Sequence, residues 1–258
     1  MMARRARLSF TAACSIAVAI LSLATCKKGI SGTRETDSTP QGMGAAPPDL
    51  PVEIQTVDVP DDEPAFVLMG PHGACPRMVF LHGMCGHGLG YLQSFQQAAR
   101  DHGGVVVVQG DISCGGAFRK YTPDPAVQDA RIERAFAAIE GRDGACTAGS
   151  DLVIAGYSQG AYIAEKMAAR FPERYSRLVL MGAPTTPSPA QLQKARGVVN
   201  ISGELDATYR MKDGTKALLN AGVPSTYLEM PGARHGEMRD AERIMREAFD
   251  WLDANARD

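Results

Sequence analysis

From residue 52 onward, short apolar runs alternate with longer amphipathic segments. The runs are nearly continuous, which is typical of parallel strands that are covered on both faces. They predict strands at 52–59, 65–69, 77–83, 104–110, 151–156, 177–182, 197–203 and 225–230. Apolar residues at helical spacing predict helices near 89–102, 125–140, 158–171, 210–221 and 238–255. The alternation predicts an α/β fold with a mostly parallel central sheet and helices on both faces. The first two strands, joined by the turn-rich segment PDDEP, are expected to form an antiparallel edge pair.

The first 26 residues have a different pattern, MMARRARLSFTAACSIAVAILSLATC. Three arginines precede an apolar run that is short for a membrane-spanning helix and is followed by a polar segment. This is typical of a secretory signal, so we expect the protein to be exported. The end of the run, LATC, resembles the lipobox of bacterial lipoproteins, in which the cysteine at the place of Cys26 is lipidated. Thr25 departs from the Gly, Ala or Ser usual there, and release as a soluble secreted protein is the alternative.

Residues 27–51 are rich in Gly, Ser, Thr and Pro and poor in large apolar side chains, which predicts a flexible linker. The expected organisation is therefore a signal at 1–26, a linker at 27–51 and one folded domain at 52–258. The whole chain has 258 residues, of which 27 are basic and 29 acidic. This near-neutral balance predicts no nucleic-acid partner. Contact with a membrane is expected only through a lipid on Cys26.

One serine lies between two glycines in GYSQG, where the predicted strand at 151–156 meets the predicted helix at 158–171. A strand, Gly-x-Ser-x-Gly and a helix form the context of a nucleophile elbow. A serine hydroxyl is a poor nucleophile, so it must project from the backbone toward a base. Gly156 and Gly160 let strand and helix approach closely, and the helix N-terminus directs free N–H groups at negative charge beside Ser158. The alternative is a tight turn with a structural role only.

With these residues, the segment 52–255 resembles the α/β-hydrolase family. GYSQG matches the family's elbow, and FLHGMCG matches the loop after its third strand. The family's chain order is nucleophile, acid, histidine. ISGELDA places Asp206 just after a predicted strand, and MPGARHGEM places His235 after the last one. The resemblance implies that Ser158 is the nucleophile, His235 the general base and then acid, and Asp206 the carboxylate that orients His235.

The resemblance also assigns the two backbone N–H groups of an oxyanion hole to Met84 and Gln159. Some alternatives stay open at this point. Glu204 competes with Asp206 for the acid, and His87, in a glycine-rich stretch, either contacts substrate or has a plain loop role. The side chain of Gln159 lines the pocket or packs against the sheet, and the same choice holds for Tyr157.

Four cysteines lie beyond the signal, at positions 75, 85, 114 and 146. An even set in an exported chain predicts disulfides, although four cysteines allow three pairings. The alternative is that some of them stay free as small core residues. In the family's strand order, the strand at 77–83 lies between those at 104–110 and 151–156. This order implies Cys85–Cys114 beside the site, after the strands, and Cys75–Cys146 at the opposite edge, before them. No Cys/His cluster has metal-ligand spacing, so neither a metal nor another cofactor is expected.

Between the predicted strands at 177–182 and 197–203 lies only APTTPSPAQLQKAR, which is too short for a cap domain. We therefore expect an open, shallow site, where some of Pro184, Thr185 and Thr186 contact substrate or merely form a connection. The sequence predicts a serine hydrolase that acts on a small-molecule carboxylic ester. A peptidase or amidase with the same three residues is the alternative, and a catalytically silent binding protein is another.

Overall fold

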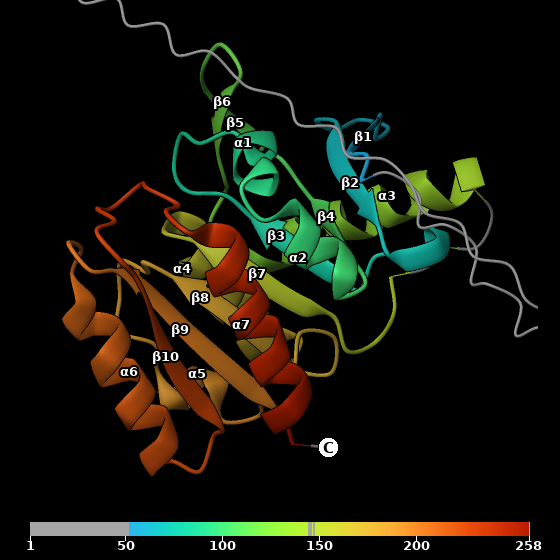
Figure 1. Cartoon of the computed structure of the whole chain (residues 1–258). Coiled ribbons are helices and arrows are strands. Elements are labelled where there is room, and N and C mark those ends of the chain that lie inside the picture. The colour runs from blue at the N-terminus through green and yellow to red at the C-terminus, as the bar shows by residue number, and fades with distance from the viewer. Residues whose placement is uncertain (1–51, 144–145, 147, 258) are drawn as a thin grey trace, which may run out of the picture. The chain divides into compact units, whose positions relative to one another are not determined.

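The structure, a computed structural model, describes residues 52–143, 146 and 148–257 (Figure 1). The predicted signal with Cys26 and the predicted linker at 27–51 lie outside the described residues. Within the part that is described, no helix has the length and apolarity needed to cross a membrane.

The predicted strands form one mixed sheet, which has eight strands within the described residues, in the order β1-β2-β4-β3-β7-β8-β9-β10. β1 and β2 pair antiparallel at one edge, β2 is antiparallel to β4, and the remaining neighbours are parallel. The antiparallel edge pair is therefore as predicted. The bounds are Gln55–Val57 for β1, Ala65–Met69 for β2, Met78–Leu81 for β3, Gly104–Val107 for β4, Val153–Tyr157 for β7, Arg177–Met181 for β8, Gly197–Gly203 for β9 and Ser225–Met230 for β10.

Helices cover both faces of this sheet, because successive strand residues point to opposite sides. Val79 and Leu81 of β3 face the core beneath α3, α4, α5 and α6, whereas Met78 and Phe80 face the core beneath α1, α2 and α7. Figure 1 shows α7 lying across one face of the sheet. The helices are α1 (Gly88–Gln93), α2 (Gln96–Asp101), α3 (Pro125–Asp143), α4 (Gln159–Arg170), α5 (Pro189–Leu192), α6 (Thr208–Asn220) and α7 (Ala241–Asn255), with a short 3-10 turn at Pro71–Gly73.

Two features differ from the prediction. The single helix expected at 89–102 is divided into α1 and α2, because Phe95 leaves the helical conformation (φ −142°, ψ 28°) and buries its ring 5.2 Å from that of Phe80. A hairpin of β5 (Ile112–Gly115) and β6 (Phe118–Lys120) was not predicted. Only one short helix, α5, lies between β8 and β9, so this connection has no cap domain.

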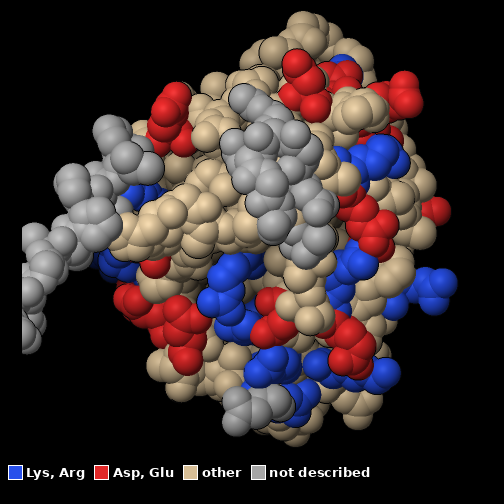
Figure 2. All heavy atoms as spheres, turned by 90° about the vertical axis from the view of Figure 1, so that its right-hand side faces the viewer, with Lys and Arg blue, Asp and Glu red and all other residues tan. Residues whose placement is uncertain are grey.

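Ion pairs join elements that are distant in the sequence. Asp62, before β2, accepts hydrogen bonds from Arg131 and Arg134 of α3. Asp151, before β7, forms ion pairs with Arg177 and, at 3.0 Å, with Arg196. Figure 2 views the molecule from the right-hand side of Figure 1 and shows basic and acidic side chains interleaved on the lower part of that face. Charges of the two signs are therefore mixed there rather than gathered by sign.

Candidate active site

Ser158 lies at the tight turn between β7 and α4. Its backbone has φ 50° and ψ −109°, a conformation that L-residues adopt rarely. A Cβ on Gly160 would lie 2.0 Å from the carbonyl oxygen of Leu81, and one on Gly156 would lie 2.4 Å from the backbone of Gly160. Only glycine fits at either place. The Ser158 N–H, in turn, donates to the carbonyl of Met181 at 2.8 Å.

Two loops at the carboxyl edge of the sheet bring Asp206 and His235 to this serine. His235, after β10, has its Nε2 atom 3.1 Å from Ser158 Oγ, and its Nδ1 atom 2.8 Å from Asp206 Oδ2, after β9. The other carboxylate oxygen of Asp206 accepts the Ala207 N–H at 2.6 Å. Because a carboxylate only accepts, Nδ1 of His235 donates and Nε2 is left to accept the serine proton. The arrangement can therefore move a proton from a hydroxyl to an imidazole.

The surroundings of His235 hold its ring in place while leaving it accessible. The Tyr157 hydroxyl accepts the Gly236 N–H at 2.6 Å, and the rings of Tyr157 and His235 lie 5.5 Å apart. Burial raises the pKa of Tyr157 to about 12, against an opposing effect of the Gly236 hydrogen bond, so the phenol stays neutral. The His235 side chain is 50% exposed and that of Asp206 only 12%. The histidine is thus reachable from solvent, and its carboxylate partner is shielded.

Glu204, the alternative acid, has a different place. Its Oε2 accepts the Gly232 N–H at 2.7 Å, which links the loop after β9 to the loop that leads to His235. The structure therefore brings Asp206, and not Glu204, to the imidazole.

The loop after β3 passes beside the serine. A Cβ on Gly83 would lie 3.7 Å from Ser158 Cβ, and the next residue, Met84, is 63% exposed. Gln159 is the first residue of α4, where N–H groups have no acceptor within the helix. Its side-chain amide bonds to the backbone of Tyr121, a contact that neither of the two sequence-based alternatives included. Tyr121 had no role in the sequence analysis, and only its contacts draw attention to it.

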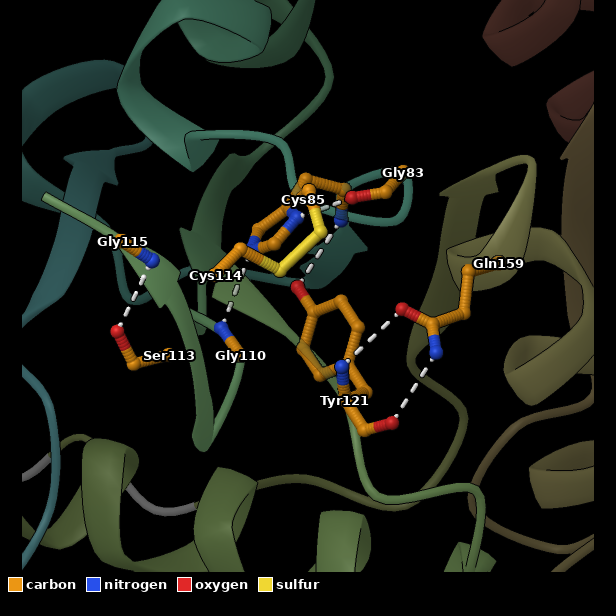
Figure 3. Close-up of a disulfide and its surroundings, with 9 residues drawn as sticks. Gly83, Cys85, Gly110, Ser113, Cys114, Gly115, Tyr121 and Gln159 are labelled. Carbon is orange, nitrogen blue, oxygen red and sulfur yellow. Dashed lines mark hydrogen bonds between the residues drawn. A yellow bond between two sulfur atoms is a disulfide. The ribbon is translucent and has the colours of Figure 1, made fainter. Parts of the chain in front are cut away.

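A disulfide joins the loop after β3 to the hairpin. Cys85 pairs with Cys114 (Figure 3). The Arg119 N–H of the same hairpin donates to the carbonyl of Gly86 at 3.0 Å. Cys75 pairs with Cys146 before β3 and β7, at the opposite edge of the sheet. These are the two pairs that the resemblance implied. Cys114, however, lies within β5 and does not simply follow a strand.

Three of the other histidines have different contacts. His82 is fully buried, and its ring bonds to Gly83 and Gly110. His87 packs its ring 5.3 Å from that of Phe66, and the ring nitrogens of His102 lie 3.3 and 3.2 Å from carboxylate oxygens of Asp250 and Asp253 in α7. Among the described residues, no group of three or more His, Cys, Asp or Glu side chains is placed to hold a metal ion.

Comparisons with known proteins agree with this architecture. A family model described as the alpha/beta hydrolase family matches residues 78–257. No curated protein matches the sequence.

Solved structures of hydrolases have the same fold. Esterase PE8 is 17% identical, with a TM-score of 0.54, over 78% of this chain and 100% of its own. The fluorophosphonate-binding serine hydrolase F of Staphylococcus aureus is 13% identical, with a TM-score of 0.57, over 80% and 98%. Dienelactone hydrolase from Anabaena variabilis is 17% identical, with a TM-score of 0.53, over 80% and 98%. At such identities the similarity shows the fold alone.

Proposed function

Because the chain belongs to the alpha/beta hydrolase family and is thus a hydrolase, we propose that it is an exported serine hydrolase that cleaves carboxylic esters through an acyl-enzyme. The observation that supports this most is the chain of hydrogen bonds from Ser158 Oγ to His235 Nε2 at 3.1 Å and from His235 Nδ1 to Asp206 Oδ2 at 2.8 Å.

In the proposed reaction His235 takes the proton of Ser158 as the serine oxygen attacks the ester carbonyl. The tetrahedral intermediate places its negative oxygen at the N–H groups of Met84 and Gln159, each worth about 3 kcal/mol in the transition state. The intermediate collapses, and His235 protonates the departing alcohol. Water then attacks the acyl-serine with His235 as base again, and the acid leaves while Ser158 regains its proton.

The large apolar side chains that remain exposed beside the site favour a small-molecule ester with an apolar part. Met84 is 63% exposed next to Gly83, and Leu205, which precedes Asp206, is 56% exposed. Tyr209, in the first turn of α6, is 59% exposed. Exposed apolar groups next to the residues of one site are typical of a surface that binds apolar ligands. A half-exposed His235 agrees with an open, shallow site.

Export is proposed from the N-terminal sequence and supported by the two disulfides, which form in oxidising compartments. We propose that the protein then either stays at the bacterial cell envelope, bound through lipid on Cys26, or is released. The proposed reaction needs no cofactor, since the serine and the imidazole supply nucleophile, base and acid.

A panel of p-nitrophenyl esters and matched p-nitroanilides, run on the wild type, on Ser158→Ala and on Ser150→Ala, tests the proposal. We expect ester hydrolysis to fall at least about 10³-fold in Ser158→Ala, because the attacking oxygen is removed. Ser150, exposed and remote before β7, is the control and should leave the rate unchanged. A fluorophosphonate probe should label the wild type and Ser150→Ala but not Ser158→Ala.

The other outcomes separate the competing functions. Faster turnover of anilides than of esters would make the protein an amidase. A wild type that neither hydrolyses the panel nor reacts with the probe would support a binding protein and overturn the proposal.

A further inference from the structure

Tyr121, just after the hairpin, bonds through its backbone to the side chain of Gln159. The Tyr121 N–H donates to Gln159 Oε1, and the Gln159 Nε2 donates to the carbonyl of Tyr121, both at 3.1 Å. Figure 3 shows these two bonds side by side, with the amide of Gln159 facing the main chain of Tyr121. The first residue of α4, directly after Ser158, is thereby fastened to Tyr121.

The hydroxyl of the same tyrosine bonds to the other segment of the proposed oxyanion hole. It accepts the backbone N–H of His82 at 3.0 Å and donates to the carbonyl of Val108 at 2.6 Å. His82 lies two residues before Met84. The Tyr121 side chain is 1% exposed, and its ring centroid is 4.6 Å from that of His82. It therefore spans, inside the protein, the space between the loop after β3 and the start of α4.

His82 holds the same loop from a second side. Its Nδ1 bonds to the carbonyl of Gly83 at 2.7 Å, and its Nε2 accepts the Gly110 N–H at 3.0 Å. Burial lowers the pKa of His82 to about 4, against the opposing Gly83 hydrogen bond, so the ring is neutral at physiological pH. A neutral ring with an acceptor Nε2 carries its proton on Nδ1, which suits both partners. The start of the loop is thus held by His82 as well as by Tyr121.

We propose that Tyr121 is a positioning residue that sets the spacing between the Met84 and Gln159 N–H groups. This inference rests on the proposed function, in which those two groups bind the oxyanion. The two donors belong to segments far apart in the sequence, and Tyr121 bonds to both, by its hydroxyl on one side and its backbone on the other. Such donors act only when they are held in place before charge develops, and a displacement of about 1 Å can cost about 10²-fold in rate.

A buried tyrosine with a merely structural role is the competing explanation, and Tyr175 offers a matched control. Tyr175 is 0% exposed and its hydroxyl donates to Asp129 Oδ1 at 2.6 Å, but it lies before β8, at the edge of the sheet opposite to Ser158. Tyr121→Phe and Tyr175→Phe each remove one buried hydroxyl. We expect both to lower the melting temperature.

Steady-state kinetics on a p-nitrophenyl ester then separates the two tyrosines. We expect kcat to fall about 10- to 100-fold in Tyr121→Phe, with KM changed less than about twofold, because only transition-state binding is weakened. Affinity for a trifluoromethyl ketone, which forms an oxyanion on Ser158, should fall by the same factor. Tyr175→Phe should keep wild-type kcat, KM and inhibitor affinity.

Gln159→Glu examines the other half of the link, because it keeps an acceptor for the Tyr121 N–H and removes the donor to the Tyr121 carbonyl. We expect the same loss in kcat at unchanged KM, and this variant replaces Tyr121→Phe if the latter does not fold. Wild-type kcat and inhibitor affinity in the folded variants would overturn the positioning role while leaving the proposed function intact. A wild type that hydrolyses no ester would instead contradict the proposed function itself.

Discussion

The two edges of the central sheet contain the same kinds of interaction, but these interactions have different roles. Each edge has a disulfide, a buried tyrosine hydroxyl and a carboxylate with several hydrogen bonds. At the amino edge, Asp151 bonds to Ser176, Arg177 and Arg196, so that one side chain joins the starts of β7, β8 and β9. At the carboxyl edge, Asp206 bonds to the adjacent Ala207 N–H and to the half-exposed ring of His235.

The difference lies in what each contact holds. At the amino edge the partners are strand ends, which the sheet itself already aligns. At the carboxyl edge the partners are loops and a histidine, which no sheet hydrogen bond places. We therefore expect changes at the amino edge to alter stability and equivalent changes at the carboxyl edge to alter turnover.

The largest expected contrast is between the two aspartates. Asp206→Asn should lower kcat about 10³- to 10⁴-fold, because an amide favours the wrong tautomer of His235. Asp151→Asn should leave kcat within about twofold and lower the unfolding free energy by about 1–3 kcal/mol, since the buried Ser176 and the partly buried Arg177 lose a charged acceptor. Ester hydrolysis and urea denaturation of both variants measure this. Loss of turnover in Asp151→Asn at unchanged stability would break the distinction between the edges.

The two disulfides offer a contrast of intermediate size. The double variant Cys85→Ser with Cys114→Ser should lower kcat about 10- to 100-fold, because the hairpin no longer holds the loop after β3, which contains Met84. Cys75→Ser with Cys146→Ser should leave kcat unchanged. Its loss in stability should nevertheless be the larger by about 1 kcal/mol, because it opens a loop with a sequence separation of 71 rather than 29.

Kinetics and thermal unfolding of the two double variants should therefore rank them in opposite orders. If the variant without Cys75–Cys146 had the lower kcat, the brace attributed to Cys85–Cys114 would be wrong.

Local pattern was enough to predict the sheet, and the family resemblance supplied the places of the three side chains. β2, β9 and β10 have the predicted bounds, since each is a run of apolar residues between turn residues. GYSQG requires a strand before it and a helix after it, and both are there. The resemblance assigned Asp206 and His235 to the loops after the last two strands, and parallel strands end at one edge of the sheet, so these loops lie on the side of Ser158.

Contacts between distant segments could not be predicted in this way. The hairpin sequence DISCGGAFRK has neither a continuous apolar run nor strict alternation, and its strands depend on the disulfide to Cys85 and the bridge to Gly86. The break at Phe95 depends on a place for its ring beside Phe80. The hydrogen bonds between Gln159 and Tyr121 join residues 38 apart in the sequence, and no periodic pattern of residues predicts such a contact.

The last contrast is in the pH dependence of stability, and it involves no change in turnover. Burial lowers the pKa of His82 from 6.5 to about 4, so the folded state favours the neutral ring. This contribution to stability is complete above about pH 6.5 and is lost as the pH falls toward 4, and it amounts to at most about 3 kcal/mol in all.

At the amino edge, burial raises the pKa of Asp151, but hydrogen bonds from Arg177 and Ser176 outweigh this effect and lower the pKa below 3.8. That contribution is complete above about pH 4 and is lost only below it.

Unfolding free energies of the wild type, His82→Asn and Asp151→Asn between pH 3 and 7.5 separate these windows. The difference between the wild type and His82→Asn should shrink from pH 6.5 to 4, whereas the difference for Asp151→Asn should stay constant there and shrink below about pH 4. Glu165, whose pKa burial raises to about 7 against the Ser188 hydrogen bond, adds stability as the pH falls, with the opposite sign. Because Glu165 is present in all three proteins, its contribution cancels in both differences.

A constant difference between the wild type and His82→Asn from pH 6.5 to 4 would mean that the His82 ring accepts a proton as readily in the folded as in the unfolded chain. The role that we attribute to His82, a neutral ring that holds this loop through Gly83 and Gly110, would then be wrong.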